Sequence, residues 1–300
     1  DCNWNIWFKA FDLLKVQVGQ VSGNLNQETI DYSNSVSAWD NGGYAISYEA
    51  NGLNIGLYSI EGWGQSLITK KGEDTRAYVN DILFNASYTA DFGTISGLFE
   101  YDSSKNIKLY DGFFEDDSTN IIYIRTPSVT SPVLSGKDAS DGFDVTDYIR
   151  FGLGYNAGNV LSDNFTFFVN VIGENAYWND SLSAFMLTPE LFAKFSSGAF
   201  TAMAFVKVPT VFAKSNTPLP AGVEILPNCG VFATAKVSYT FGGTTAYVYV
   251  KEAFIDHFVK VNVKPGITGN VGICSWEVAA DMSIGSTFSV SVPVIFTVNF

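Results

Sequence analysis

Residues Thr287 to Phe300 decide the fold, and they read T-F-S-V-S-V-P-V-I-F-T-V-N-F. Every even-numbered position carries Phe or Val, whereas the odd-numbered positions carry mostly Ser, Thr, Pro and Asn. Side chains of a β-strand point alternately to its two faces, so this stretch predicts a strand with one apolar and one mostly polar face. It is longer than the about 9–11 residues that a strand needs to cross a membrane. The prediction then requires that the rest of the chain repeats the pattern.

The same alternation does run along the chain. It predicts strands over residues 3–10, 14–19, 44–49, 53–58, 81–88, 94–100, 148–155, 165–171, 185–195, 200–208, 231–240, 245–251, 259–264, 275–282 and 287–300. Short turns such as Ala50-Asn51-Gly52, with the favoured Asn-Gly pair, alternate with long connections at 22–43, 61–76, 102–144 and 209–228. The stretch 265–270 is expected to end a strand at Pro265, and 120–125 is a further candidate for a short strand.

Aromatic residues mark the predicted strand ends. Next to the short turns lie Phe11, Tyr48, Tyr88, Phe92, Tyr155, Phe165, Phe195, Phe200, Phe241 and Phe300. Near the opposite ends lie Tyr78, Tyr101, Tyr177, Trp178, Phe185 and Phe288. Two aromatic belts are typical of a β-barrel at the two membrane interfaces. A soluble β-sandwich is the alternative, since it also gives alternating strands.

The last strand, with its C-terminal Phe300, resembles the closing strand of bacterial outer-membrane β-barrels. The block W-F-K-A-F-D-L-L-K-V-Q-V-G, Trp7 to Gly19, is similar to a hairpin of spirochaete porin-like proteins. The resemblance implies an all-β fold: one transmembrane antiparallel β-barrel over 1–300, of about 14–16 strands, with short periplasmic turns and long extracellular loops. From Lys15 onward, the strand 14–19 included, fourteen strands are predicted, and 3–10 would be a fifteenth. Because bacterial barrels have even numbers, either 3–10 lies outside the wall or a preceding strand is missing from this sequence.

Composition narrows the function. The chain has 300 residues, 47% hydrophobic and only 16% charged, with a net charge of −13 that argues against nucleic-acid binding. No apolar run approaches the ~18 residues of a membrane helix, and without a visible signal peptide we expect a mature chain or a fragment. Three scattered cysteines and one histidine, His257, form neither a disulfide framework nor a metal site. We expect no cofactor, no metal and no enzymatic activity.

The charged residues of the strands share the polar face, which would line the barrel. They are Lys9, Lys15, Glu49, Asp81, Glu100, Arg150, Glu190, Lys194, Lys207, Lys236, Lys251, Lys260, Lys264, Glu277 and Asp281, nine basic and six acidic. Charged groups need water, so this set predicts a water-filled lumen with a small positive excess.

Five apolar residues also fall on the polar face: Phe168, Phe192, Met203, Phe205 and Phe232. They form either a track for sugars or hydrophobic solutes, or an apolar patch that packs under an inward-folded loop. In general porins the third long loop folds into the barrel, and the resemblance implies the same for 102–144. Glu115, Asp116 and Asp117 would then be the acidic side of a constriction, although an outward, solvated acidic loop is the alternative.

The leading expectation is therefore a porin in the outer-membrane lipid that lets small hydrophilic solutes and ions diffuse through its lumen. A homotrimer is one possible assembly of such a porin. A substrate-selective channel and a surface adhesin or structural barrel remain as alternatives.

Overall fold

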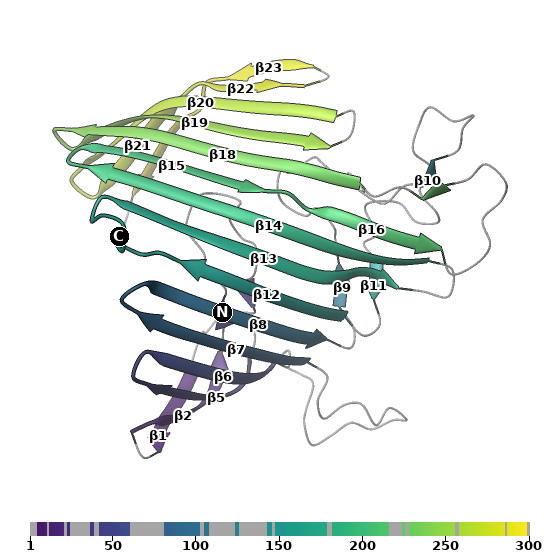
Figure 1. Ribbon diagram of the computed structural model, residues 1–300. Helices are drawn as coiled ribbons and strands as arrows, with labels where there is room; N and C mark the ends of the chain where they lie inside the picture. Colours follow the sequence, from purple (N-terminus) through teal and green to yellow (C-terminus); the bar gives the residue numbers. More distant parts are fainter. Residues whose placement is uncertain are drawn as a thin grey trace.

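The computed structural model describes residues 5–10, 12–20, 23–24, 37–38, 42–60, 81–102, 105–107, 124–125, 143–145, 148–178, 182–215, 224–225, 228–255, 258–285 and 287–298. These residues form β-strands and turns, and among them no helix is long and apolar enough to span a membrane. One large antiparallel sheet contains most of the strands (Figure 1).

Eighteen strand segments build that sheet. They are β1 (Asn5–Ala10), β2 (Leu14–Gln20), β5 (Gly42–Ala50), β6 (Leu53–Ile60), β7 (Asp81–Ala90), β8 (Gly93–Asp102), β12 (Tyr148–Asn156), β13 (Phe165–Trp178), β14 (Leu182–Ser197), β15 (Phe200–Lys207), β16 (Thr210–Ser215), β18 (Asn228–Phe241), β19 (Thr244–Ile255), β20 (Phe258–Val271), β21 (Cys274–Ala279), β22 (Asp281–Ile284), β23 (Phe288–Ser291) and β24 (Val294–Val298). Three small two-stranded sheets lie in the connections: β3 (Gly23–Asn24) with β4 (Ser37–Ala38), β9 (Lys105–Ile107) with β11 (Phe143–Val145), and β10 (Ile124–Arg125) with β17 (Glu224–Ile225).

Fifteen wall strands result, because three pairs of segments are single strands with an interruption. β15 and β16 both pair with β14 and with β18, β21 and β22 both pair with β20, and β23 and β24 continue the last strand. Each wall strand pairs with its neighbours in chain order, from β1 to β23 and β24. Of the two expectations for the N-terminal stretch, a position outside the wall is wrong, because β1 pairs with β2 along its whole length.

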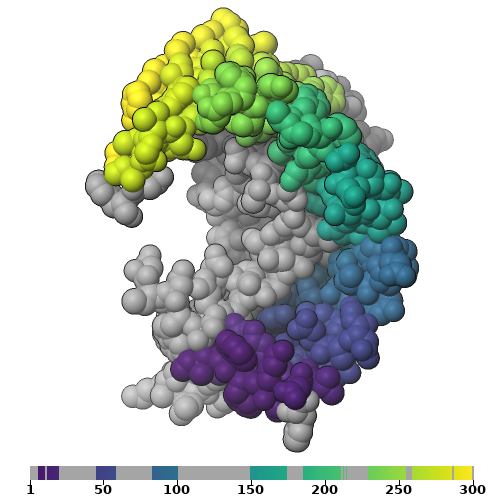
Figure 2. Space-filling model, turned by 90° about the vertical axis from the view of Figure 1, so that its left-hand side faces the viewer, coloured from purple at the N-terminus to yellow at the C-terminus, as the bar shows by residue number. Residues whose placement is uncertain are grey.

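The sheet is strongly curved. Viewed along its strands, it forms an incomplete ring that opens between the N-terminal strands (purple) and the last strands (yellow) in Figure 2. Among the described strands β1 and β24 do not pair with each other. The two edge strands run in the same direction, since fourteen antiparallel steps separate the first strand from the fifteenth.

Proline interrupts the wall less than the sequence predicts. The expected loop from Pro209 is wrong for its first part, since β16 resumes at Thr210 and the carbonyl of Pro209 accepts from the Gly230 N–H at 3.0 Å. The expected break at Pro265 is also wrong, because β20 continues to Val271. Proline lacks an N–H donor but keeps its carbonyl acceptor. The Pro265 carbonyl accepts from the N–H of Ala280, the residue between β21 and β22, at 2.9 Å.

The connections differ in part from the expected long–short alternation. In the C-terminal half, the end of the wall that was expected to carry long loops has short connections at 179–181, 256–257 and 285–287. The first two are short because β13, β14, β19 and β20 extend further than predicted. The last stretch, predicted as one unbroken strand, divides at Val292-Pro293 into β23 and β24. The tight turn at Asn51-Gly52 is as predicted, with positive φ at both residues (51° and 80°) as a two-residue hairpin loop requires.

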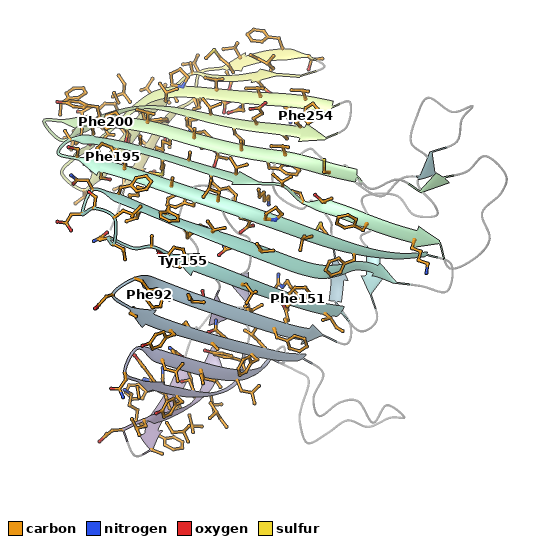
Figure 3. The ribbon with its side chains drawn as sticks, in the orientation of Figure 1. Phe92, Phe151, Tyr155, Phe195, Phe200 and Phe254 are labelled. Atoms are coloured by element: carbon orange, nitrogen blue, oxygen red, sulfur yellow. The ribbon has the colours of Figure 1, made fainter. Side chains whose placement is uncertain are left out.

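The outer face of the sheet is apolar. Nearly all exposed large hydrophobic residues of the strands occupy outer-face positions, with Trp7 and Ile295 as exceptions. Phe92, Tyr155, Phe195 and Phe200 lie at the end with the tight turns, and Phe151 and Phe254 lie toward the other end (Figure 3). The Tyr155 hydroxyl donates to the Phe92 carbonyl at 2.7 Å. This bond connects two neighbouring hairpins at the end of the wall that has the tight turns.

Candidate functional site

The inner face of the curled sheet carries the charged residues. The cross-strand register places every predicted pore-lining residue on this one face, namely Lys9, Lys15, Glu49, Asp81, Glu100, Arg150, Glu190, Lys194, Lys207, Lys236, Lys251, Lys260, Lys264, Glu277 and Asp281. The predicted constriction residues Glu115, Asp116 and Asp117 lie outside the described residues, so the inward fold of 102–144 stays a prediction.

Two further acids join the inner face because the strands are longer than predicted. Glu174 lies opposite Arg150, and Asp102 lies opposite Asp81. The inner positions of the wall therefore carry nine basic and eight acidic residues, where the sequence predicts nine and six. Two charged residues, Lys214 and Glu252, take outer-face positions. Both lie close to the ends of their strands, where a charge facing lipid costs about 0–1 kcal/mol instead of the 2–4 kcal/mol at the membrane centre.

A buried ion pair lies on the inner face away from the tight turns. The Arg150 Nε donates to Glu100 Oε2 at 2.7 Å, and the Nη2 of Arg150 also contacts this oxygen. Arg150 is 8% and Glu100 1% exposed. β12 and β8 place the two residues directly opposite each other, so the pair is fixed by strand register. A charge that is buried this deeply is tolerated because it is paired and hydrogen-bonded.

The apolar residues of the inner face meet at mid-wall. The rings of Phe168 and Phe192 stack at 5.0 Å between centroids, and Phe205 completes a buried cluster. Met203 packs against this cluster together with Tyr249. Phe232 is likewise buried and lies on the next strand, β18, opposite Lys207 of β15. The Lys207 ammonium is 5.7 Å from the centroid of the Phe232 ring.

Polar partners surround this cluster. Asn170 donates its side-chain N–H to Glu190 Oε2 at 3.1 Å, and both residues are buried. On β20, Asn262 donates to Asp281 Oδ1 at 2.5 Å. Lys251 is buried opposite Asn262. The inner face is therefore a mixture of charged and amide groups around an aromatic centre.

A cavity of about 620 Å³ opens on the inner face toward the tight turns. Its lining comes from β14, β15, β18, β19, β20 and β21, and includes Lys194, Met203, Lys236, Tyr247, Tyr249, Lys264 and Glu277. The Glu277 carboxylate accepts from the Tyr247 hydroxyl at 2.5 Å and pairs with the Lys264 ammonium at 2.6 Å. The Lys236 ammonium lies 5.2 Å from the centroid of the Tyr247 ring.

The sequence-based site set omits Tyr247, Tyr249 and Asn170. All three fall on the polar face of the two-residue period, which is the signal that finds them. What alternation alone cannot supply is their grouping, because β14 and β21 come together only through the register of the strands between them. Among the described residues, no group of three side chains is suited to hold a metal ion.

An antiparallel wall that is apolar outside, banded by aromatics and charged inside is the arrangement of a transmembrane β-barrel. No family model and no curated protein matches the chain. It is similar to the solved anion-selective porin from Comamonas acidovorans, with a TM-score of 0.49 and 10% identity over 98% of this chain and 84% of that one. It is also similar to a porin refined at 1.8 Å, with a TM-score of 0.45 and 13% identity over 93% of this chain and 91% of that one. At these values the likeness carries no inference about solute, and the spirochaete resemblance stays a prediction.

Proposed function

We propose that the chain forms a water-filled channel in the bacterial outer membrane, through which small hydrophilic solutes and ions diffuse. The observation that supports this most is the division of the wall into two faces. The inner positions hold seventeen charged residues, and the outer face exposes aliphatic and aromatic side chains. A charged inner face requires water, and an apolar outer face with interfacial aromatic bands suits lipid.

The size of the wall supports an open interior. Fifteen strands approach the 16 to 18 strands of barrels that leave an aqueous channel, whereas about 8 strands leave only room for side chains. The 620 Å³ cavity on the inner face is consistent with space inside the ring.

The alternative that the apolar inner-face residues form a binding track for sugars or hydrophobic solutes has less support. Phe192 is 1% and Phe205 0% exposed, so their rings offer no surface on which a passing solute could stack. The aromatic cluster instead acts as packing, and the polar positions around it remain the candidates for solute contact.

Planar bilayer recording tests the proposal. We expect refolded protein to give stepwise single-channel currents in KCl, and liposomes that contain it to swell in solutions of small sugars but not of large dextrans. The matched control is the same protein, heat-denatured and added at the same concentration. A folded protein that inserts into bilayers but passes neither ions nor sugars would contradict the channel and favour an adhesin or structural barrel. Chemical crosslinking of the inserted protein tests the separate proposal of a homotrimer.

A further inference from the structure

The cavity near the tight turns combines two kinds of surface. Lys194, Lys236 and Lys264 supply positive charge among Ser and Thr hydroxyls. Met203 and Tyr249 alternate with these lysines across the neighbouring strands, and they pack against the buried Phe cluster beside them. The volume of about 620 Å³ lies within the range of ligand sites in proteins, about 300–1,000 Å³.

Charge favours an anionic ligand. Among the described residues, three lysines and one carboxylate, Glu277, line the cavity, so this part of the lining is formally positive by two. Glu277 already engages Lys264 and the Tyr247 hydroxyl, at 2.6 and 2.5 Å. This arrangement shows how the cavity wall holds a carboxylate: an ammonium and a phenol converge on one oxygen. The positive excess of this lining, to which Lys194 and Lys236 contribute, favours a second carboxylate, one brought by a solute.

The apolar residues of the lining favour a ligand with a ring. The Tyr247 ring already faces the Lys236 ammonium. A flat group in the cavity would therefore contact the rings of Tyr247 and Tyr249 and the thioether of Met203 beside the lysine ammonium groups. The rigid Phe cluster beside Met203 and Tyr249 keeps that surface in place, because two of its rings are stacked and all three are buried. A ligand that satisfies both kinds of group carries a carboxylate close to an apolar ring.

We propose that this cavity is a saturable binding site for small aromatic carboxylates within the channel. The inference rests on the proposed channel function for the route by which the ligand arrives. Binding there would place a solute against the inner wall and reduce the open cross-section.

Block of the single-channel current by benzoate tests the site. Sodium benzoate added at constant ionic strength is expected to reduce the conductance along a saturating curve. Acetate, which has the carboxylate without the ring, and benzyl alcohol, which has the ring without the charge, are expected to block weakly at the same concentrations. Calorimetric titration of benzoate into the detergent-solubilised protein gives the affinity independently of conductance.

Variants separate the site from the general charge of the lumen. We expect Lys236→Gln and, independently, Lys194→Gln to weaken benzoate binding about tenfold, equivalent to about 1.4 kcal/mol. Lys260→Gln is the matched control, because it removes the same charge from the same face at a position that does not line the cavity. Met203→Ser is expected to weaken benzoate binding and leave the weak effect of acetate unchanged.

Three outcomes would overturn the proposal: an unsaturable benzoate effect, an equal effect of acetate, or an equal loss in Lys260→Gln and Lys236→Gln. Channels that conduct without benzoate binding would refute the site alone. Absence of conductance together with calorimetric binding that depends on Lys236 would refute the channel and retain the site.

Discussion

Single residues on the inner face show how charges are kept within the wall. Arg150 and Glu100 are both buried and face each other across β12 and β8. We expect Arg150→Met to lower the free energy of unfolding by about 3–5 kcal/mol, because it leaves the Glu100 carboxylate buried without its cation. Urea titration of the refolded protein, followed by tryptophan fluorescence, measures the change.

Two comparisons isolate the pair. The double variant Glu100→Gln with Arg150→Met should recover much of the lost stability, since no buried charge then lacks its counterion. Lys9→Met removes an exposed inner-face charge and should change stability by at most about 0.5 kcal/mol. Equal losses in Lys9→Met and Arg150→Met would show that the ion pair has no special role.

A glycine on the outer face makes room for an aromatic ring. A Cβ at Gly173 would overlap the ring of Phe151, which stacks with Phe185 at 6.1 Å between centroids. Gly173→Ala should therefore displace Phe151 and cost about 1–3 kcal/mol. At Gly97, also on the outer face, a Cβ would make an ordinary contact at 3.7 Å with Leu153, so Gly97→Ala is the matched control and should be nearly neutral. The same unfolding assay compares them, and equal costs would contradict the packing argument.

At the scale of the strand, alternation assigns neighbouring residues to opposite environments. Ala235 takes an outer position on β18 and Lys236 an inner position at the cavity. In a background without native cysteines, Ala235→Cys should resist a membrane-impermeant thiol reagent in vesicles, whereas Lys236→Cys should react. The rate of labelling, measured by mass spectrometry, checks this. Denatured protein, in which both cysteines must react, is the control, and equal labelling of both in the folded protein would refute the assignment of faces.

The directions of the strands predict that two of the cysteines lie too far apart to form a disulfide. Cys229 lies at the start of β18, beside the connection at 216–227, whereas Cys274 starts β21 directly after the tight turn at 272–273. The two thiols are therefore at opposite ends of the wall and are free. A disulfide needs Cα atoms within about 7 Å, so none should form between them. Detection of that crosslink in oxidised native protein by peptide mapping would overturn the strand order.

For the whole molecule, the distribution of charge predicts ion selectivity. The inner residues near the tight turns include Lys194, Lys236 and Lys264 against Glu277, so that end of the interior is cationic. We expect the double variant Lys194→Gln with Lys236→Gln to shift the reversal potential in a salt gradient toward cation preference, because fixed charges in a narrow aqueous space attract counterions. The shift should diminish as ionic strength rises. Lys9→Gln, an exposed charge near the open edge, serves as control; no difference between the variants would place these lysines outside the ion path.

The open edge is also a property of the whole molecule. In lipid every backbone N–H and C=O needs a partner, so the outer edges of β1 and β24, which pair with no other described strand, have to be covered. Since the two strands run in the same direction, their direct pairing would be parallel.

The sequence by itself determined the fold class and the face of each strand residue. A two-residue period depends only on the local backbone, so Phe192 and Lys194 can be assigned to one face before any partner strand is known. Turns such as Asn51-Gly52 are also local, because the residues themselves set the backbone angles.

Only the tertiary structure decided which inner residues meet and where strands end. The stacking of Phe168 on Phe192 and the approach of Tyr247 to Glu277 follow from the register of separate strands. Strand ends depend on neighbours too: β20 passes through Pro265 because β19 and β21 still pair with the residues around it. Hydrogen bonds between strands are non-local, and a period along one strand contains no information about the partner that will supply them.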